Sequence, residues 1–270
     1  MLNSLLPPLA LLAAFLAAFA VYCVLRGMGK AQPQAVKHDR VFGPFLAGFL
    51  IWLIGPVERR LIGKVSPNVV TVVSLMLCAA TGAAAGEGAL GAAAWLYAIA
   101  GILDILDGRI ARLGNRQTAA GALLDSVADR WGELFVFAGY TWFLRESPWL
   151  LAVLGAFGGS VMVSYTRARA EGLGVALSTG IMQRAERIVL VCVGTLAAAA
   201  VDEPTAQWIV GVTMVTTGLL SIGTALSRWH TAYKMLTRPA QQAAETPAPT
   251  PVRPIPLPAT ADLRRPVEQH

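Results

Sequence analysis

The stretch that decides the fold of this chain is DILDGRIARLGNRQTAAGALLDSVAD, residues 104–129. It lies between two hydrophobic stretches and carries four aspartates, Asp104, Asp107, Asp125 and Asp129. Residues three or four positions apart share one face of a helix, so the first two aspartates fall on one helix face and the last two on the next. Carboxylates at the ends of membrane-length segments are costly to desolvate, which makes these four the first candidates for function.

Two acidic pairs on facing helices predict a metal site. They would repel strongly at low dielectric unless a positive charge lay between them, and divalent metal is the simplest candidate. The stretch has no histidine or cysteine, and an all-oxygen ligand set favours Mg²⁺ or Mn²⁺ over zinc. A pair of such ions stabilises the attacking and leaving oxygens of phosphoryl chemistry. Gly108 and Ala111 leave the adjacent helix surface nearly bare, and Arg112 can grip a phosphate.

The order of these residues resembles a known family. The fixed positions follow the pattern D-x-x-D-G-x-x-A-R, eight residues, G-x-x-x-D-x-x-x-D, which is similar to the complete signature of the CDP-alcohol phosphatidyltransferases. The resemblance implies that an alcohol displaces CMP from CDP-diacylglycerol or a related CDP-lipid. It also implies two Mg²⁺ or Mn²⁺ ions and a homodimer.

The resemblance assigns roles to single residues. The implied metal ligands are Asp104, Asp107 and Asp125, with Asp129 as a further ligand or as the base that takes the acceptor's proton. The implied contacts to the nucleotide and its phosphates are Gly108, Ala111 and Arg112, while Gly121 allows close helix approach. A structural alternative is that the acids lie at solvated helix ends and pair with Arg109, Arg116 and Arg130. Such pairs require no particular spacing.

The segment Ser66-Pro67-Asn68-Val69-Val70-Thr71 has two interpretations. Ser66 suits a helix N-cap and Pro67 suits the first helical position. The segment also resembles the part of the family that borders the nucleotide pocket, which makes Asn68 and Thr71 candidate nucleotide contacts. Both interpretations stay open, because a helix cap can also line a pocket.

Composition predicts an integral membrane protein, since 55% of the residues are hydrophobic. Seven spans are expected, at about 5–25, 67–86, 89–111, 119–144, 147–166, 186–202 and 205–227. Basic residues gather in the connections on one side, which predicts that the aspartates open towards the cytoplasm from a multi-pass cell (inner) membrane. The predicted fold is all-α: a six-helix bundle of the phosphatidyltransferase type, with an extra N-terminal span and an interfacial helix at 45–54.

Four regions are expected along the chain. They are an N-terminal anchor at 1–30, a linker with the interfacial helix at 31–64, the membrane domain at 65–238, and a disordered Pro-rich tail at 239–270. The three cysteines lie far apart in apolar runs, where packing is the expected role. The three histidines lie in predicted loops or tails, so we expect no catalytic histidine, and no nucleic acid partner is expected.

A second basic cluster bears on the acceptor. Arg167 and Arg169 close one predicted span, and Arg184 and Arg187 open the next. The positive charge that usually flanks membrane spans explains how many basic residues there are. The use of Arg and not Lys at all four positions favours bidentate binding of a phosphate. These stretches resemble segments of bacterial phosphatidylinositol phosphate synthases and their archaeal ether-lipid relatives, which implies inositol phosphate as acceptor. Glycerol 3-phosphate, as in a phosphatidylglycerophosphate synthase, is the alternative.

Two other classes of protein remain to be compared with the enzyme. A cation-coupled transporter would also carry acids within its membrane spans. An inactive scaffold would not need four intact aspartates at these spacings.

Overall fold

The computed structural model describes residues 17–28, 43–177 and 180–237. The expected linker at 31–42, the Pro-rich tail, and residues 5–16 of the first predicted span lie outside these ranges. Within them the chain is helical and contains no strand. The all-α prediction is therefore confirmed for the described part of the chain.

A short helix, Ala17–Gly27, precedes seven longer ones. These are α2 (Gly43–Leu61), α3 (Pro67–Gly86), α4 (Leu90–Leu113), α5 (Ala119–Phe143), α6 (Leu150–Gly172), α7 (Arg184–Ala198) and α8 (Glu203–Thr237). The predicted interfacial helix at 45–54 proves longer, because α2 runs on through Pro56 to its basic last turn.

The predicted last span also ended too early. The predicted span ends at residue 227 because an arginine such as Arg228 typically flanks a span. In the structure Arg228 is only 3% exposed, and it donates a 2.8 Å hydrogen bond to the carbonyl of Val163. A buried, hydrogen-bonded arginine does not end a helix, so α8 continues to Thr237.

Four of the described helices are long and apolar enough to cross a membrane: α3, α4, α6 and α8. This supports an integral membrane protein. By contrast, α5 carries too many charged residues to count as equally apolar, and α7 is only 15 residues long. The exact number of spans stays a prediction.

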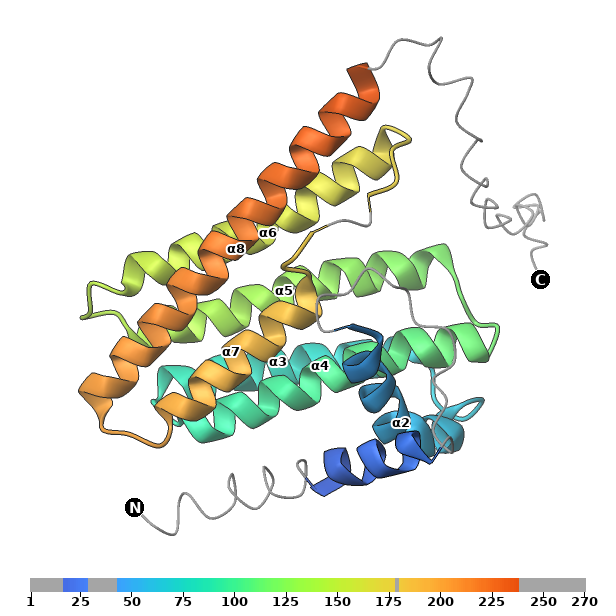
Figure 1. Cartoon of the computed structure of the whole chain (residues 1–270), viewed down its shortest axis with the longest axis horizontal. Helices are drawn as coiled ribbons and strands as arrows, with labels where there is room; N and C mark the ends of the chain where they lie inside the picture. Colours follow the sequence, from blue (N-terminus) through green and yellow to red (C-terminus); the bar gives the residue numbers. More distant parts are fainter. Residues whose placement is uncertain (1–16, 29–42, 178–179, 238–270) are drawn as a thin grey trace, which may run out of the picture.

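The helices form one bundle (Figure 1). There α6 and α8 run side by side, α3 packs against both α4 and α5, and α7 packs against both α4 and α8. One apolar core joins the helices, with Tyr97, Tyr140, Val191 and Met214 among its buried members. The bundle brings the cytoplasmic end expected for α4 next to the start of α5, which positions the aspartates.

Close packing of α3 on α5 depends on two glycines. A Cβ at Gly139 would collide with the carbonyl of Gly82, and a Cβ at Gly82 would collide with the carbonyl of Phe135. Backbone cannot move aside as a flexible side chain can, so only glycine fits at these positions. The same small-residue packing is common between membrane helices.

We therefore expect Gly139→Val to destabilise the protein by about 3 kcal/mol, through overpacking of backbone against backbone. Gly158→Val is the matched control, because a Cβ at Gly158 meets nothing within 4 Å. The check is the thermal unfolding midpoint of each purified variant in the same detergent. Equal midpoints for the two variants would contradict the close α3–α5 contact.

Candidate active site

The aspartates come together because a short turn joins α4 to α5. The backbone of Asn115 takes a left-handed conformation (φ 50°), which turns the chain after Gly114. Thr118 then caps α5: its hydroxyl accepts a 3.0 Å hydrogen bond from the backbone N–H of Gly121. With the turn closed in this way, the end of α4 lies against the beginning of α5.

Three carboxylates form the centre of the site. Asp104, Asp107 and Asp125 each offer one oxygen, and these oxygens all lie within 4.8 Å of one another. Asp107 is only 4% exposed, and its Oδ2 accepts a 2.6 Å hydrogen bond from the hydroxyl of Thr71 on α3. Oxygen ligands at this spacing suit a hard divalent cation, and the hydroxyl of Thr71 fixes the orientation of one of them.

Asp129 lies in a different environment. The guanidinium of Arg184, the first residue of α7, forms ion pairs with both Asp104 and Asp129. Arg130 approaches the second oxygen of Asp129 at 3.2 Å. The positive charge that the acidic pairs require is thus supplied in part by an arginine from a distant helix.

The alternative of simple ion pairing at helix ends fits poorly. Among the three arginines it invoked, only Arg130 contacts an aspartate of the site. Arg109 instead pairs with the buried Glu58 of α2, and Arg116 donates to the carbonyl of Gly63 at 3.2 Å. These two arginines hold α2 and the turn that follows it against the bundle.

The candidate nucleotide residues gather beside the carboxylates. A Cβ at Gly121 would lie 3.2 Å from the Oδ1 of Asn68, so α3 reaches the start of α5 there. A Cβ at Gly108 would lie 3.1 Å from an Nη atom of Arg112, so that guanidinium lies over the glycine. Ala111 is half-buried on the same helix. Their roles toward a nucleotide stay predictions.

The four candidate acceptor arginines are separated by the fold. Arg184 contacts the aspartates, whereas Arg187 is 2% exposed and pairs with the buried Glu133 of α5. Arg167 is exposed and pairs with Glu171 on its own helix at 2.8 Å. Sequence reasoning missed Glu133, although its spacing of four residues from Asp129 was a readable signal.

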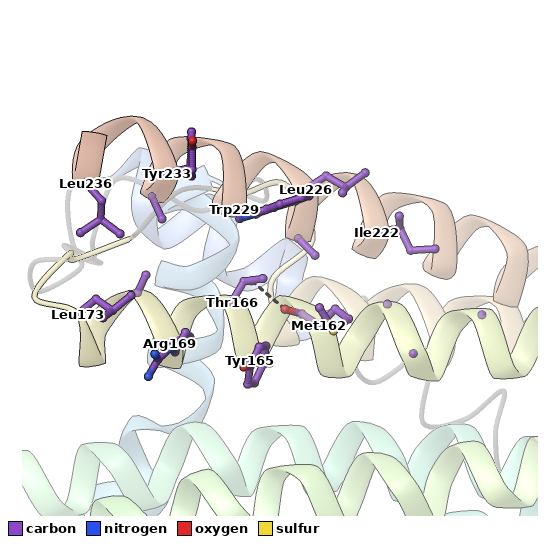
Figure 2. A pocket seen from close by; sticks show the side chains of 16 residues that line it. Met162, Tyr165, Thr166, Arg169, Leu173, Ile222, Leu226, Trp229, Tyr233 and Leu236 are labelled. Atoms are coloured by element: carbon purple, nitrogen blue, oxygen red, sulfur yellow. Dashed lines mark hydrogen bonds between the residues drawn. The ribbon is translucent and has the colours of Figure 1, made fainter. Parts of the chain in front are cut away.

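Arg169 lines a cavity of about 760 Å³ between α6 and α8. Figure 2 shows Arg169 and Thr166 on the α6 side, opposite Trp229, Tyr233 and Leu236 of α8. The lining is mostly apolar and includes none of the four aspartates. Thr166 donates a 2.7 Å hydrogen bond to the carbonyl of Met162 and so keeps its hydroxyl occupied. This groove is therefore distinct from the carboxylate site.

Comparison with known proteins gives a consistent family. Residues 64–220 match the family model for CDP-alcohol phosphatidyltransferase. The archaetidylinositol phosphate synthase of Methanothermobacter thermautotrophicus is 38% identical over 148 residues, which cover 53% of this chain and 75% of the relative. The phosphatidylinositol phosphate synthase of Mycobacterium tuberculosis is 31% identical over 191 residues, which cover 66% of this chain and 84% of the relative.

Solved structures give the same result. The crystal structure of the M. tuberculosis phosphatidylinositol phosphate synthase with CDP-DAG bound matches with a TM-score of 0.59 and 30% identity, over 67% of this chain and 94% of that one. The same enzyme in complex with manganese and citrate also has a TM-score of 0.59 at 30% identity, over 66% and 88% of the two chains. This chain belongs to the CDP-alcohol phosphatidyltransferase family and is a membrane transferase of phospholipid biosynthesis.

Proposed function

We propose that this enzyme transfers the phosphatidyl group of CDP-diacylglycerol, or of a related CDP-lipid, to a hydroxyl of inositol phosphate, with release of CMP. A bond forms between the acceptor oxygen and the lipid-side phosphorus, and the bond from that phosphorus to CMP breaks. The carrying observation is the carboxylate cluster of Asp104, Asp107 and Asp125 with Arg184 beside it.

The carboxylate cluster is suited to a divalent metal. Asp104, Asp107 and Asp125 would hold one Mg²⁺ or Mn²⁺, which when bound would stabilise negative charge on the phosphate oxygens. A second ion would need Asp129, whose carboxylate is held by Arg184 and Arg130. Binding of a second ion therefore requires Arg184 to release Asp129. Metal use is supported by the relative whose structure contains manganese.

The chain's own residues have separate tasks in this proposal. Asp129 accepts the proton of the acceptor hydroxyl when it is not a metal ligand. Arg112 grips a phosphate of the nucleotide beside the bare backbone of Gly108 and Ala111. Asn68 and Thr71 border the nucleotide from α3, Thr71 by orienting Asp107.

Two observations favour inositol phosphate as the acceptor. The relatives reported above are named archaetidylinositol phosphate synthase and phosphatidylinositol phosphate synthase, whereas glycerol 3-phosphate remains the alternative acceptor. Arg184 stands beside the carboxylates with its Nε unpartnered in the described structure, so it has a donor free for an acceptor phosphate. Family membership argues against the cation-coupled transporter, and the intact aspartates argue against a scaffold.

We also propose that the aspartates face the cytoplasm and that the enzyme is a homodimer. Arg184, Arg167 and Arg169 lie at the helix ends near which the carboxylates are expected to open, as the positive-inside rule predicts for a cytoplasmic face. The homodimer is proposed from the family resemblance.

An acceptor panel tests the substrate. The purified enzyme receives CDP-diacylglycerol with inositol phosphate, glycerol 3-phosphate, free inositol or serine, and CMP release is measured. We expect inositol phosphate to give the highest kcat/KM. Faster turnover with free inositol or serine than with both phosphorylated acceptors would refute recognition of the acceptor phosphate.

Replacing the candidate arginines should separate their roles. We expect Arg184→Ala to lower kcat/KM for the acceptor by about 100-fold, because a charge-assisted contact to the acceptor phosphate is lost. The KM for the CDP-lipid should stay within about threefold of the wild-type value. Arg167→Ala and Arg187→Ala test the other candidates in the same assay. The control is Arg145→Ala, which replaces an exposed arginine just past the C-terminal end of α5. An unchanged acceptor kcat/KM in Arg184→Ala would exclude its phosphate-binding role.

A further inference from the structure

A buried polar network lies one helical turn beyond the aspartate site. Glu133 of α5 is 3% exposed and forms an ion pair with Arg187 of α7, which is 2% exposed. The other carboxylate oxygen of Glu133 accepts a 2.7 Å hydrogen bond from the hydroxyl of Ser160 on α6, a fully buried residue. Three helices therefore meet at one carboxylate.

Stability alone is a weak explanation for this network. Burial of an ion pair carries a large desolvation penalty, and apolar side chains of similar volume often serve stability equally well. The guanidinium of Arg187 is not devoted to Glu133 alone, because it also donates a 3.4 Å hydrogen bond to the carbonyl oxygen of Met182. What a buried ion pair does provide is one defined geometry, as in helix bundles whose register depends on a single polar contact.

The network fixes the register of α7 against α5. Three side-chain contacts join these helices, and they follow the same order along α5 as along α7. They are Asp129 with Arg184, Glu133 with Arg187, and the Tyr140 hydroxyl with that of Thr195 at 2.6 Å. The two helices therefore run parallel. The rise of 1.5 Å per residue separates the first two contacts by about 6 Å along α5 and about 4.5 Å along α7.

The position of Arg184 depends on this register. It is the first residue of α7, directly after the N-cap Gln183, so helical backbone holds it on its C-terminal side only. Close backbone packing joins α7 to α4 and α8 rather than to α5. Long side chains thus bridge α5 and α7, and the bridge next to Arg184 is the pair of Glu133 and Arg187.

We propose that Glu133 is a positioning residue for the transferase reaction. With its carboxylate fixed by Ser160, it anchors Arg187 against α5 and thereby places Arg184 between Asp104 and Asp129. Arg187 then acts through its anchoring of α7. This inference rests on the proposed function in one respect: it takes from it that Arg184 binds the acceptor phosphate during the reaction.

A double-mutant cycle tests the proposal. Glu133→Gln keeps the shape of the side chain and removes the charge that holds Arg187. We expect kcat/KM for inositol phosphate to fall about 30-fold, since a misplacement of about 1 Å near the reacting atoms costs on the order of 100-fold. In the Arg184→Ala background the same change should cost no more than about threefold, because both changes then act through one group. If the loss of kcat/KM in the double variant equals the product of the losses in Glu133→Gln and Arg184→Ala, the proposal is overturned.

Tyr140→Phe is the matched control. It removes another buried polar contact between α5 and α7, the one farther from the aspartates. We expect its thermal midpoint to fall while kcat/KM stays within about twofold of wild type, with or without Arg184→Ala. A loss in Tyr140→Phe as large as in Glu133→Gln would mean that general loosening of the helices, and not placement by Glu133, sets the activity.

An experimental structure of Glu133→Gln gives a readout that does not depend on activity. We expect Arg184 to lose its contact with Asp104, Asp129 or both. An unmoved Arg184 would overturn the proposal, even if activity fell. Absence of CMP release by the wild-type enzyme would instead refute the proposed function and leave this structural result standing.

Should Glu133→Gln fail to fold, Ser160→Ala replaces it in the cycle. This change removes one hydrogen bond from the carboxylate and leaves the ion pair in place. We expect a loss of about threefold to tenfold in acceptor kcat/KM that disappears in the Arg184→Ala background. A loss that persists there, or no loss in either background, would overturn the proposal.

Discussion

Asp107→Asn is expected to lower CMP release by at least about 1,000-fold while the enzyme stays folded. Asp107 is the most buried carboxylate of the site, and the hydroxyl of Thr71 donates to it. Asparagine keeps the shape and an oxygen for Thr71 but loses the negative charge that binds a cation. The checks are steady-state CMP release and the thermal midpoint of the purified variant.

The same substitution at the other three aspartates extends the test. Asp104→Asn and Asp125→Asn should be as inactive as Asp107→Asn, because ligands of one centre act as a unit. Asp129→Asn separates its two possible roles when Mn²⁺ binding is measured by electron paramagnetic resonance. Unchanged Mn²⁺ binding with lost turnover identifies a base, and lost binding identifies a ligand. Glu146→Gln, an exposed acid on the α5–α6 connection, is the control and should keep wild-type activity.

Retention of near wild-type CMP release by any one aspartate variant would contradict the role assigned to that residue. Retention by all of them would contradict the carboxylate site as a whole. Loss of the folded protein in Asp107→Asn alone would show that the charge of Asp107 serves the structure, and Asp125→Asn would then decide the catalytic question.

Removal of divalent metal is expected to lower turnover by about 1,000-fold or more, with recovery on addition of Mg²⁺ or Mn²⁺. Zinc should restore little activity, because the cluster of Asp104, Asp107 and Asp125 offers oxygen atoms only. Binding to the folded state alone also raises stability, by about 2.7 kcal/mol at a metal concentration 100 times Kd. The thermal midpoint of the wild-type enzyme should therefore rise with Mn²⁺.

Asp107→Asn provides the control for this second prediction, since its midpoint should respond weakly to Mn²⁺. Full turnover after exhaustive chelation would refute a metal-dependent reaction. A rise in midpoint of the same size in wild type and Asp107→Asn would show that Mn²⁺ binds elsewhere.

The local part of the site could be predicted from sequence. Helical spacing alone predicts that Asp104 and Asp107 share a face, and the short stretch between the two helices favours an approach of the start of α5 to them. The proximity of α3 was implied only by resemblance, and the structure gives its physical basis in the bond from Thr71 to Asp107.

The long-range part could not be predicted in the same way. Arg184 pairs with Asp104 across 80 residues of chain, and no spacing rule connects two such positions. Arg187, close by in the sequence, is also predicted to bind the acceptor phosphate, because flanking and binding arginines look alike in sequence. Only the burial of its partner Glu133 distinguishes an internal ion pair from a surface charge.

Charges within membrane helices caused the remaining differences. Arg228 ended the predicted last span, although the structure buries it against the carbonyl of Val163. Glu133 also lies inside a predicted span, where an ionisable residue is by default a candidate for function. Hydropathy locates a helix well but cannot tell a buried, satisfied charge from one that faces water.

The most direct test of the proposed reaction is the stoichiometry of CMP and lipid product. The purified enzyme receives CDP-diacylglycerol, Mn²⁺ and inositol phosphate, and the products are quantified by mass spectrometry. We predict equal amounts of CMP and phosphatidylinositol phosphate, both dependent on the acceptor and both absent with Asp107→Asn. CMP release that does not depend on the acceptor, or the absence of an inositol-containing phospholipid, would contradict the proposed transfer.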